Sequence, residues 1–362
     1  MSRLTFVLWN GTQGGAECLN LEMASRASEL GHTSTVIFVT DGNPLIARAR
    51  DFGVATCELG LERGSHLIRH PRRYASTVRS TRPDLVIVMG VNHIAWTLRV
   101  GGYRGRLIAV EHGSLLRYEA SSPRERLKRR ADRAIAARVV TVEVVVSNFL
   151  REYVDRVPHA RRTVTIPNGV DHRRFRPNRR TSAPVTFGFA GRLVPGKGLG
   201  ALIEAFARIS STLDARLRIA GEGPLRSELE SQAQRSGVTG IDFVGPVGDM
   251  PRFWQSVDVA VAPSGTIIES FGMAALEAMA CGLPVIVTRN GGLADLVADG
   301  VTGSIVEPCD VAGLELALAE YADEETIATR GASARQVAVE RFSLDACLEA
   351  YLRFRAADGN GR

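Results

Sequence analysis

The sequence holds few lysines, few aromatic residues and few cysteines. Lys128 and Lys197 are the only lysines among 45 basic residues, and aromatic residues make up 6% of the 362 residues. The five cysteines form no Cys-x-x-Cys pair and their number is odd, which argues against a disulfide framework and a zinc site. No apolar run approaches the ~20 residues that span a bilayer, and the N-terminus lacks the long apolar stretch of a secretory signal. We therefore expect a protein of the reducing cytoplasm.

Charge is divided unevenly between the two halves of the chain. Residues 1–180 hold 30 Lys and Arg against 16 Asp and Glu, whereas residues 181–362 hold 15 against 23. A basic half favours an anionic partner, either a phosphorylated acceptor, a membrane surface or nucleic acid. Nucleic acid is disfavoured because no aromatic residues are interleaved with the basic ones. Segment 124–138 has seven basic residues at helical spacing, which predicts a helix that lies on an anionic lipid surface or a solvated basic helix.

Segments rich in valine and isoleucine alternate with amphipathic helical stretches. This alternation predicts an α/β fold with parallel sheets that carry helices on both faces, and the length fits two domains. A helix is expected over 16–30, where Gly31 stops it. The expected strands are residues 4–9, 35–39, 85–89, 107–110, 139–146, 185–190, 217–220, 241–244, 259–262 and 285–288.

The strand pattern restarts after a segment rich in Pro, Asn and Arg, which is typical of a linker. We expect a Rossmann-like domain over 1–170, a linker over 171–184 and a second Rossmann-like domain over 185–343. A C-terminal helix within 344–362 is able to cross back to the first domain. Ligands of doubly wound sheets bind at the carboxyl ends of the strands, so two such domains predict a cleft between them.

Two motifs of the first half follow predicted strands. The glycine-rich segment 10–17 opens a helix, where Gly15 would let a ligand approach the backbone and the helix N-terminus favours anions. It does not match Gly-x-Gly-x-x-Gly, so no dinucleotide site is predicted, and a plain strand-to-helix turn stays open. His112, in the motif Glu-His-Gly, follows the predicted strand 107–110. There it can donate a hydrogen bond to a ligand hydroxyl or serve as a base, or it is a structural histidine.

A third motif, Gly-Arg-Leu-Val-Pro-Gly-Lys-Gly, runs from Gly191 to Gly198 between a predicted strand and a predicted helix. It nearly matches the phosphate loop, but Gly198 replaces the hydroxyl residue that would bind magnesium. We therefore predict phosphate binding by Arg192 and Lys197 without a metal ligand. Two fixed cations can neutralise the charge that builds on a departing diphosphate. A basic surface loop is the alternative.

A fourth motif places two carboxylates, Glu269 and Glu277, eight residues apart. Eight helical residues span about 12 Å, roughly the separation of the two diol-bearing units that flank a diphosphate. Carboxylates accept paired hydroxyl donors well. An amphipathic helix with two solvated acids is the alternative.

The residues between these carboxylates predict a helix N-terminus. Ser270 is expected to cap a helix that begins at Phe271 and Gly272 and continues through Met273. Free backbone N–H groups at that end would suit a diphosphate.

Taken in order, these motifs resemble glycosyltransferase family 4, the retaining GT-B transferases. Each piece is weak, whereas the ordered set covers nearly the whole chain and is specific. Further matching segments are VSNFLR at 146–151, PNGVD at 167–171, AGEGPLR at 220–226, FVGPV at 243–247, CGLPVI at 281–286, NGGLADLV at 290–297 and DGVTG at 299–303.

The resemblance implies a role for each candidate residue on the donor side. It implies that Arg192 and Lys197 hold the donor diphosphate, that Glu269 holds the transferred sugar and that Glu277 holds the ribose. It also implies that backbone amides at 271–272 contact the diphosphate.

The resemblance also implies how the reaction proceeds. His112 would contact the sugar near the reacting carbon, and Gly15 would lie beside the donor phosphate and the acceptor. In such enzymes the acceptor hydroxyl is thought to attack from the leaving-group side and to pass its proton to the donor phosphate, so no protein nucleophile is required. No Asp-x-Asp pair occurs, which agrees with Arg192 and Lys197 replacing a metal ion, and no metal cofactor is expected.

Three positions depart from the family pattern. Gly196 stands where a polar residue is usual, Asp295 where Glu is common, and Gly-Thr-Ile-Ile at 265–268 where an aromatic residue is common. The last departure bears on which sugar is accepted.

The leading hypothesis is a retaining, metal-independent transferase of a hexose-type sugar, with a UDP-sugar favoured as donor and a GDP-sugar next. The expected acceptor is phosphate-bearing or membrane-linked, as in cell-envelope glycan or glycolipid synthesis. The expected location is the cytoplasm or the inner face of the plasma membrane. The alternatives are a GT-B sugar-nucleotide epimerase or hydrolase, a P-loop-like ATPase and a catalytically idle binding protein.

Overall fold

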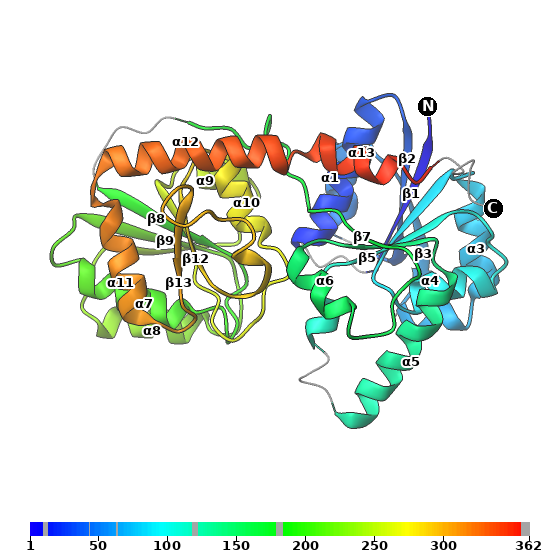
Figure 1. Ribbon diagram of the computed structural model, residues 1–362, viewed down its shortest axis with the longest axis horizontal. Helices are drawn as coiled ribbons and strands as arrows, with labels where there is room; N and C mark the ends of the chain where they lie inside the picture. Colours follow the sequence, from blue (N-terminus) through cyan, green and yellow to red (C-terminus); the bar gives the residue numbers. More distant parts are fainter. Residues whose placement is uncertain (10–13, 43, 63, 118–121, 179–183, 356–362) are drawn as a thin grey trace. The chain divides into compact units, whose positions relative to one another are not determined.

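The computed structural model describes residues 1–9, 14–42, 44–62, 64–117, 122–178 and 184–355. They form two compact units, one of Met1–Gly169 with Leu344–Arg362 and one of Val170–Ser343. Each unit is built on one parallel sheet with helices packed against it (Figure 1). The predicted α/β class with two doubly wound parallel sheets is confirmed.

The sheet of the first unit has the strand order β3-β2-β1-β4-β5-β6-β7, and every pairing is parallel. Its central strands are nearly continuous runs of buried aliphatic residues because helices cover both faces. The strands are β1 (Arg3–Leu8), β2 (Thr33–Thr40), β3 (Ala55–Leu61), β4 (Leu85–Met89), β5 (Leu107–Glu111), β6 (Val142–Val145) and β7 (Thr163–Thr165). The helices are α1 (Gly15–Glu29), α2 (Leu45–Asp51), α3 (Pro71–Ser80), α4 (His93–Val100), α5 (Pro123–Val139), α6 (Asn148–Val154) and α13 (Leu344–Leu352).

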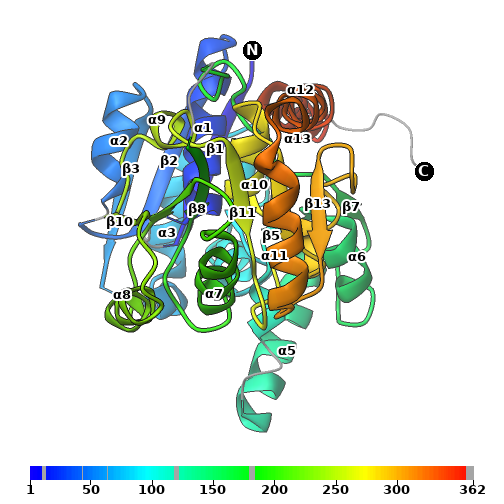
Figure 2. The ribbon, with the colours of Figure 1, turned by 90° about the vertical axis from the view of Figure 1, so that its left-hand side faces the viewer.

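The second unit repeats this architecture with the order β10-β9-β8-β11-β12-β13, again all parallel. Helices α7 and α11 lie side by side on one face of the sheet, and α10 and α12 lie side by side on the other (Figure 2). The strands are β8 (Val185–Ala190), β9 (Ala215–Ala220), β10 (Ile241–Gly245), β11 (Val259–Ala262), β12 (Val285–Thr288) and β13 (Gly303–Val306). The helices are α7 (Leu199–Ile209), α8 (Arg226–Arg235), α9 (Met250–Trp254), α10 (Met273–Ala280), α11 (Val311–Ala319) and α12 (Glu324–Arg341).

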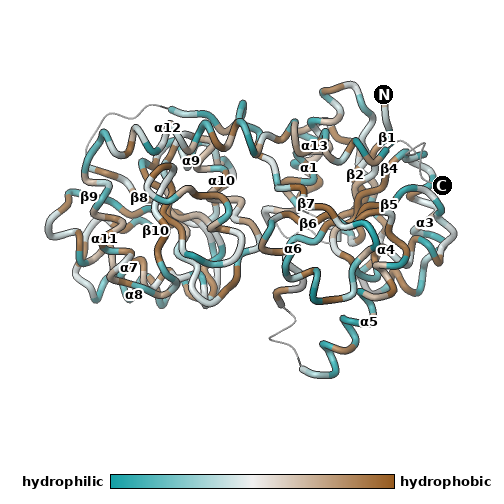
Figure 3. Tube along the Cα trace, viewed as in Figure 1, coloured by the Kyte–Doolittle hydropathy of each residue, from teal (hydrophilic) through white to brown (hydrophobic). Residues whose placement is uncertain are grey.

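Hydropathy follows these layers. The strands of both sheets are the most hydrophobic parts of the trace, whereas α5 is largely hydrophilic (Figure 3). Among the residues that the structure describes, no helix combines the length and the apolar character needed to cross a bilayer.

Most predicted strands match observed ones, with two kinds of error. The expected strand 139–146 is too long, since α5 extends to Val139 and β6 begins only at Val142. Strands β3, β7 and β13 were not predicted. All three are sheet edges, and an edge strand needs a shorter or less apolar run than a central one.

The C-terminal helix and the start of the expected linker belong to different units. Helix α13 packs on α1 of the first unit, where Arg26 Nε donates to Asp345 Oδ1 at 2.6 Å and Cys347 Sγ lies 3.9 Å from Met23 Sδ. The start of the expected linker packs within the second unit, because Arg335 of α12 donates to the carbonyl of His172 at 2.8 Å. Residues 179–183 of that linker lie outside the described residues.

Candidate functional site

Glycines lie at the carboxyl ends of β8, β9 and β10 in the second sheet. The amide of Gly191 donates to Ala220 O at 3.0 Å, and the amide of Gly221 donates to Gly245 O at 2.8 Å. A Cβ atom at Gly221 would lie 1.8 Å from the carbonyl oxygen of Gly191. Only glycine fits so close a backbone approach. The predicted loop therefore begins where the ends of two strands are tightly packed.

The loop from Gly191 to Gly198 is fixed against a second loop that precedes α10. The carbonyl of Gly196 accepts from the amide of Gly265 at 2.8 Å and from that of Ile267 at 3.2 Å. Gly198 has φ +76°, and a Cβ atom there would lie 1.7 Å from Pro263 O. The glycine that replaces the magnesium-binding hydroxyl residue is therefore required by the backbone, because a serine or threonine does not fit.

Asn290 holds the second loop from the other side. This residue is 6% exposed, and its Nδ2 donates to the carbonyls of Ser264 at 3.1 Å, Gly265 at 2.6 Å and Ile267 at 3.0 Å. The amide of Gly292 donates to Glu269 O at 2.7 Å. The sequence places Asn290 in a matching segment without a role, whereas the structure makes it the anchor of this loop.

Lys197 and Glu269 contact each other across the two loops. Lys197 Nζ forms an ion pair with Glu269 Oε1, and Ser264 Oγ donates to the same oxygen at 2.7 Å. The two side chains are 17% and 19% exposed. The structure thus brings together two residues that lie 72 positions apart in the sequence.

Arg192 differs from Lys197 in its surroundings. Its side chain is exposed, and it makes no hydrogen bond or ion pair with any residue that the structure describes. Arg192 can therefore turn toward an anion without breaking a hydrogen bond or ion pair within the described chain.

Helix α10 begins later than predicted. Its N-cap is Gly272, with φ +104°, and its first residue is Met273. The prediction that Ser270 is the N-cap is wrong, since the left-handed backbone of Gly272 starts the helix two residues farther on. Phe271 is 3% exposed and packs edge-on against Phe342. Because Gly272 has no side chain, the N-cap residue offers the first-turn amides no acceptor, and these amides can take an anion.

The late start of α10 also changes the relation between the two carboxylates. Glu269 lies in the loop, four residues before the helix, and Glu277 lies on the helix. The separation of about 12 Å, which assumes one continuous helix, therefore does not apply. Oε2 of Glu277 accepts a hydrogen bond from Trp254 Nε1 at 3.2 Å.

In the first unit, the turn after β5 is fixed by a buried carboxylate. Glu111 accepts hydrogen bonds from the amides of Gly113 at 2.8 Å and Ser114 at 2.5 Å. His112 lies between Glu111 and Gly113 in this turn. Its Nε2 is buried and has no hydrogen-bond partner among the described residues. Burial lowers the pKa of His112 to about 4, so the imidazole is neutral at pH 7.

Arg133 of the basic helix α5 forms an ion pair with the carboxylate that fixes this turn. It is 1% exposed and pairs with two fully buried carboxylates, Glu111 at 3.4 Å and Glu143. Burial is the main cause that raises the pKa of Glu143, against the opposing charge of Arg133. The remaining basic residues of α5 are solvent-facing or half-buried, namely Arg124, Arg126, Lys128, Arg129, Arg130 and Arg138.

A second histidine lies at the same edge of this sheet and was not predicted. His93 follows β4, the neighbour of β5, and its amide donates to Asp132 Oδ2 at 3.1 Å. Trp96 Nε1 donates to the other carboxylate oxygen at 2.6 Å. Burial acts to raise the pKa of Asp132, but hydrogen bonds from His93 and Trp96 outweigh it and lower that pKa. The available signal was a histidine just after a predicted strand, as for His112.

Gly15 is the first residue of α1, and it is exposed. Its neighbour Gly14 is the N-cap, and residues 10–13 of the predicted glycine-rich segment lie outside the described residues. Within the described ranges, no group of three or more His, Cys, Asp and Glu side chains is arranged to hold a metal ion.

Family models match both parts of the chain. The model of Glycosyltransferase Family 4 matches residues 13–174, and the model of Glycosyl transferases group 1 matches residues 171–336. Together they leave only the first 12 and last 26 residues unmatched.

Curated relatives share about a third of their residues with the chain. A GDP-mannose-dependent alpha-(1-6)-phosphatidylinositol dimannoside mannosyltransferase of Mycobacterium tuberculosis is 36% identical over 248 residues, 63% of this chain and 62% of that protein. A D-inositol 3-phosphate glycosyltransferase of Saccharomonospora viridis is 35% identical over 288 residues, 69% of this chain and 64% of that protein. The chain thus spans less than two thirds of the length of these relatives.

Solved structures share the fold at low sequence identity. HepE of Anabaena, in complex with UDP and glucose, superposes with a TM-score of 0.81 at 21% identity, over 98% of this chain and 99% of that one. Sucrose-phosphate synthase of Thermosynechococcus elongatus superposes with a TM-score of 0.80 at 20% identity, over 98% of each chain.

Proposed function

The chain belongs to glycosyltransferase family 4 and has the GT-B fold, and on that premise we propose that it transfers a sugar from a nucleotide diphosphate sugar to an acceptor hydroxyl. The observation that carries this proposal is the pair of hydrogen-bonded loops that brings Lys197 to Glu269 just before the N-terminus of α10, where the N-cap residue Gly272 has no side chain. This arrangement offers an anion two kinds of partner, a fixed cation and backbone amides.

The donor would bind by exchanging one contact for several. Lys197 and Glu269 now neutralise each other, and a donor would separate them, with its diphosphate on Lys197 and its sugar hydroxyls on Glu269. Arg192 would turn onto the same diphosphate, and the first-turn amides of α10 would complete the anion site. Glu277 would accept the ribose hydroxyls.

The reaction would break the bond between the sugar's anomeric carbon and the diphosphate oxygen, and would form a bond from that carbon to the acceptor oxygen. The acceptor's proton would pass to the departing phosphate. Lys197 and Arg192 would stabilise the charge on the leaving group, which a metal ion does in other transferases. We propose that the anomeric configuration is retained. Neutral His112 would donate or accept a hydrogen bond at the sugar without adding charge.

GDP-mannose is the donor we propose first. The name of the Mycobacterium tuberculosis relative, 36% identical, specifies that nucleotide sugar. A UDP-sugar, which the sequence favours, is the second candidate. Nucleotide release from GDP-mannose, UDP-glucose and UDP-N-acetylglucosamine, measured with and without acceptor, would rank the donors.

For the acceptor we propose a hydroxyl of a phosphate-bearing polyol or glycolipid, docked on the basic first unit. Phosphatidylinositol dimannoside and inositol 3-phosphate occur in the names of the relatives and have this chemistry. Helix α5 presents exposed arginines and Leu127, which is 70% exposed, and would hold the protein on an anionic membrane at the cytoplasmic face. Vesicles with anionic lipid should bind the protein at low salt and release it at high salt. Equal binding to neutral vesicles would contradict this surface.

The test of the activity compares wild-type protein with Lys197→Ala. Turnover should fall about 10²-fold or more, as when a contact to transition-state charge is lost. Arg235→Ala, on α8, is the matched control and should retain wild-type turnover. A near-wild-type rate for Lys197→Ala would refute the assigned role. Fast release of free sugar or epimerised nucleotide without any acceptor would favour the hydrolase or epimerase alternative.

The structure argues against a magnesium-dependent phosphate loop. A hydroxyl residue at position 198 would clash with Pro263 O, so the ATPase alternative lacks its metal ligand. Magnesium-dependent ATP hydrolysis that Lys197→Ala abolishes would revive it. Unchanged biological activity after replacement of both Arg192 and Lys197 would instead favour a catalytically idle binding protein.

A further inference from the structure

Glu277 has a partner in the second unit that the motif pattern does not identify. The indole Nε1 of Trp254, the last residue of α9, donates to Glu277 Oε2 at 3.2 Å. Trp254 is 1% exposed, whereas Glu277 is half-buried. The two residues are 23 positions apart, so tertiary packing creates this contact.

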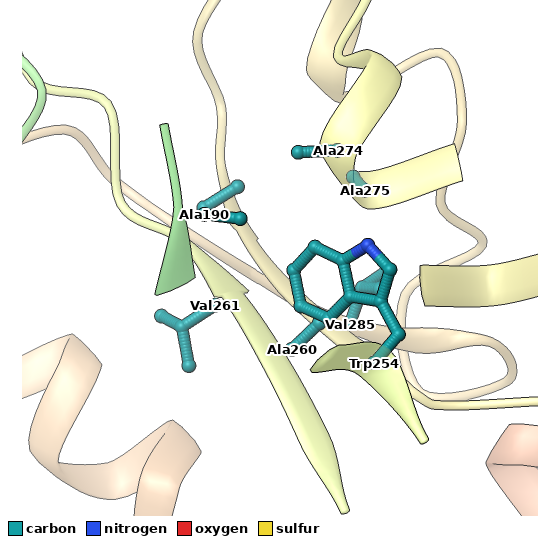
Figure 4. Close-up of a pocket in the computed structure, with 8 residues that line it drawn as sticks. Ala190, Trp254, Ala260, Val261, Ala274, Ala275 and Val285 are labelled. Atoms are coloured by element: carbon teal, nitrogen blue, oxygen red, sulfur yellow. The ribbon is translucent and has the colours of Figure 1, made fainter. Parts of the chain in front are cut away.

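The indole is held in place by small side chains. In Figure 4 its ring lies between α10 and the strands of the second sheet, and its nitrogen is on the side that faces Ala274 and Ala275. The cavity beside the ring is small: the centre of a water molecule could move within a volume of only about 10 Å³, which is room for about one water. So little free space beside a side chain that is 1% exposed restricts reorientation of the ring.

This contact fixes a carboxylate before any ligand arrives. A carboxylate has about four acceptor positions, and the indole N–H uses one of them. A hydrogen bond to an ionised group is strong, and it limits the rotamers that Glu277 can adopt. A side chain that is already oriented loses less conformational freedom on binding than a free one.

We propose that Trp254 is a positioning residue for ribose recognition, whose indole N–H orients the Glu277 carboxylate toward the 2′- and 3′-hydroxyls of a ribonucleoside diphosphate. Trp254 does not touch the nucleotide but acts through Glu277. This inference rests on the proposed function, which assigns Glu277 to the ribose. It predicts that the indole matters only for ligands that carry ribose hydroxyls.

The test measures the affinity of GDP and UDP, and of their 2′,3′-dideoxy forms, by calorimetry. Trp254→Phe keeps an aromatic ring but removes the N–H, and it should weaken binding of the ribonucleotide about tenfold. Binding of the dideoxy form should stay within about twofold of wild type, because that ligand cannot use the oriented carboxylate. Glu277→Gln should discriminate in the same way, and the double variant should be no weaker than Glu277→Gln.

Trp96→Phe is the matched control, since Trp96 also donates its indole N–H to a carboxylate, that of Asp132 in the first unit, at 2.6 Å. It should leave the affinity of both ligand forms unchanged. Trp254→Phe that weakens both forms equally, or neither, would overturn the inference while the ribose assignment stands. Glu277→Gln that does not discriminate between the forms would overturn the ribose assignment and the inference together.

A second measurement leaves Trp254 in place and covers the case in which Trp254→Phe fails to fold. The indole ¹H–¹⁵N signals of Trp9 and Trp96 are assigned with Phe variants, which identifies that of Trp254. The Trp254 signal should move in Glu277→Gln and on addition of the ribonucleotide. A signal that does neither would overturn the inference.

Discussion

His112 offers a prediction that does not depend on knowing any substrate. Burial lowers its pKa from the ordinary value of 6.5 to about 4. Above pH 6.5 the imidazole is neutral in the folded and the unfolded chain, so it adds no pH dependence. Between pH 6.5 and pH 4, His112 is protonated in the unfolded chain but remains neutral in the folded chain. Stability is therefore lost as the pH falls through this window, by on the order of 3 kcal/mol in total and about 2 kcal/mol by pH 5.

The assay compares wild type with His112→Gln, which cannot titrate. Guanidinium unfolding at pH 7.5 and pH 5 gives the free energy of unfolding of each protein. The wild type should lose about 2 kcal/mol more than the variant between these two pH values. Long-range ¹H–¹⁵N spectra of the imidazoles report the titration of His112 directly. A His112 midpoint near 6.5, or equal losses in both proteins, would refute the assignment of a buried neutral imidazole.

Three further predictions concern metal dependence, the loops of the second unit and the buried charges. EDTA should leave transfer activity intact, and strict dependence on added metal would contradict the metal-free scheme. Gly198→Ser should lower the stability of the second unit by at least about 1–3 kcal/mol, because the left-handed backbone and the contact with Pro263 O both oppose a side chain; an unchanged melting temperature would contradict this packing. Arg133→Met should cost about 3–5 kcal/mol by leaving two buried carboxylates unpaired. The exposed control Arg138→Met should stay within about 0.5 kcal/mol of wild type, and equal effects of the two would contradict the buried network.

The fold class could be predicted because strong local patterns carry it. Buried central strands such as β4 and β5 are continuous aliphatic runs, and these were located to within one residue. Edge strands are under weaker constraint, since only one side of each pairs with a neighbour, and β3, β7 and β13 carry a pattern too short or too polar to stand out.

The candidate site was less predictable because its geometry depends on backbone conformation and on distant contacts. The capping role of Ser270 failed because the left-handed φ of Gly272 delays the helix. The partners of Glu277 and Asp132, which are Trp254 and His93, lie 23 and 39 residues away, and no local pattern links them. The seven basic residues of segment 124–138 looked alike in the sequence, yet the structure buries Arg133.

A crystal structure of the protein with GDP or UDP bound would test the central claim most directly. Our account predicts that the two phosphates lie within hydrogen-bonding distance of Lys197 Nζ and the first-turn amides of α10, with the ion pair between Lys197 and Glu269 opened. Phosphates bound elsewhere, with that ion pair intact, would contradict it.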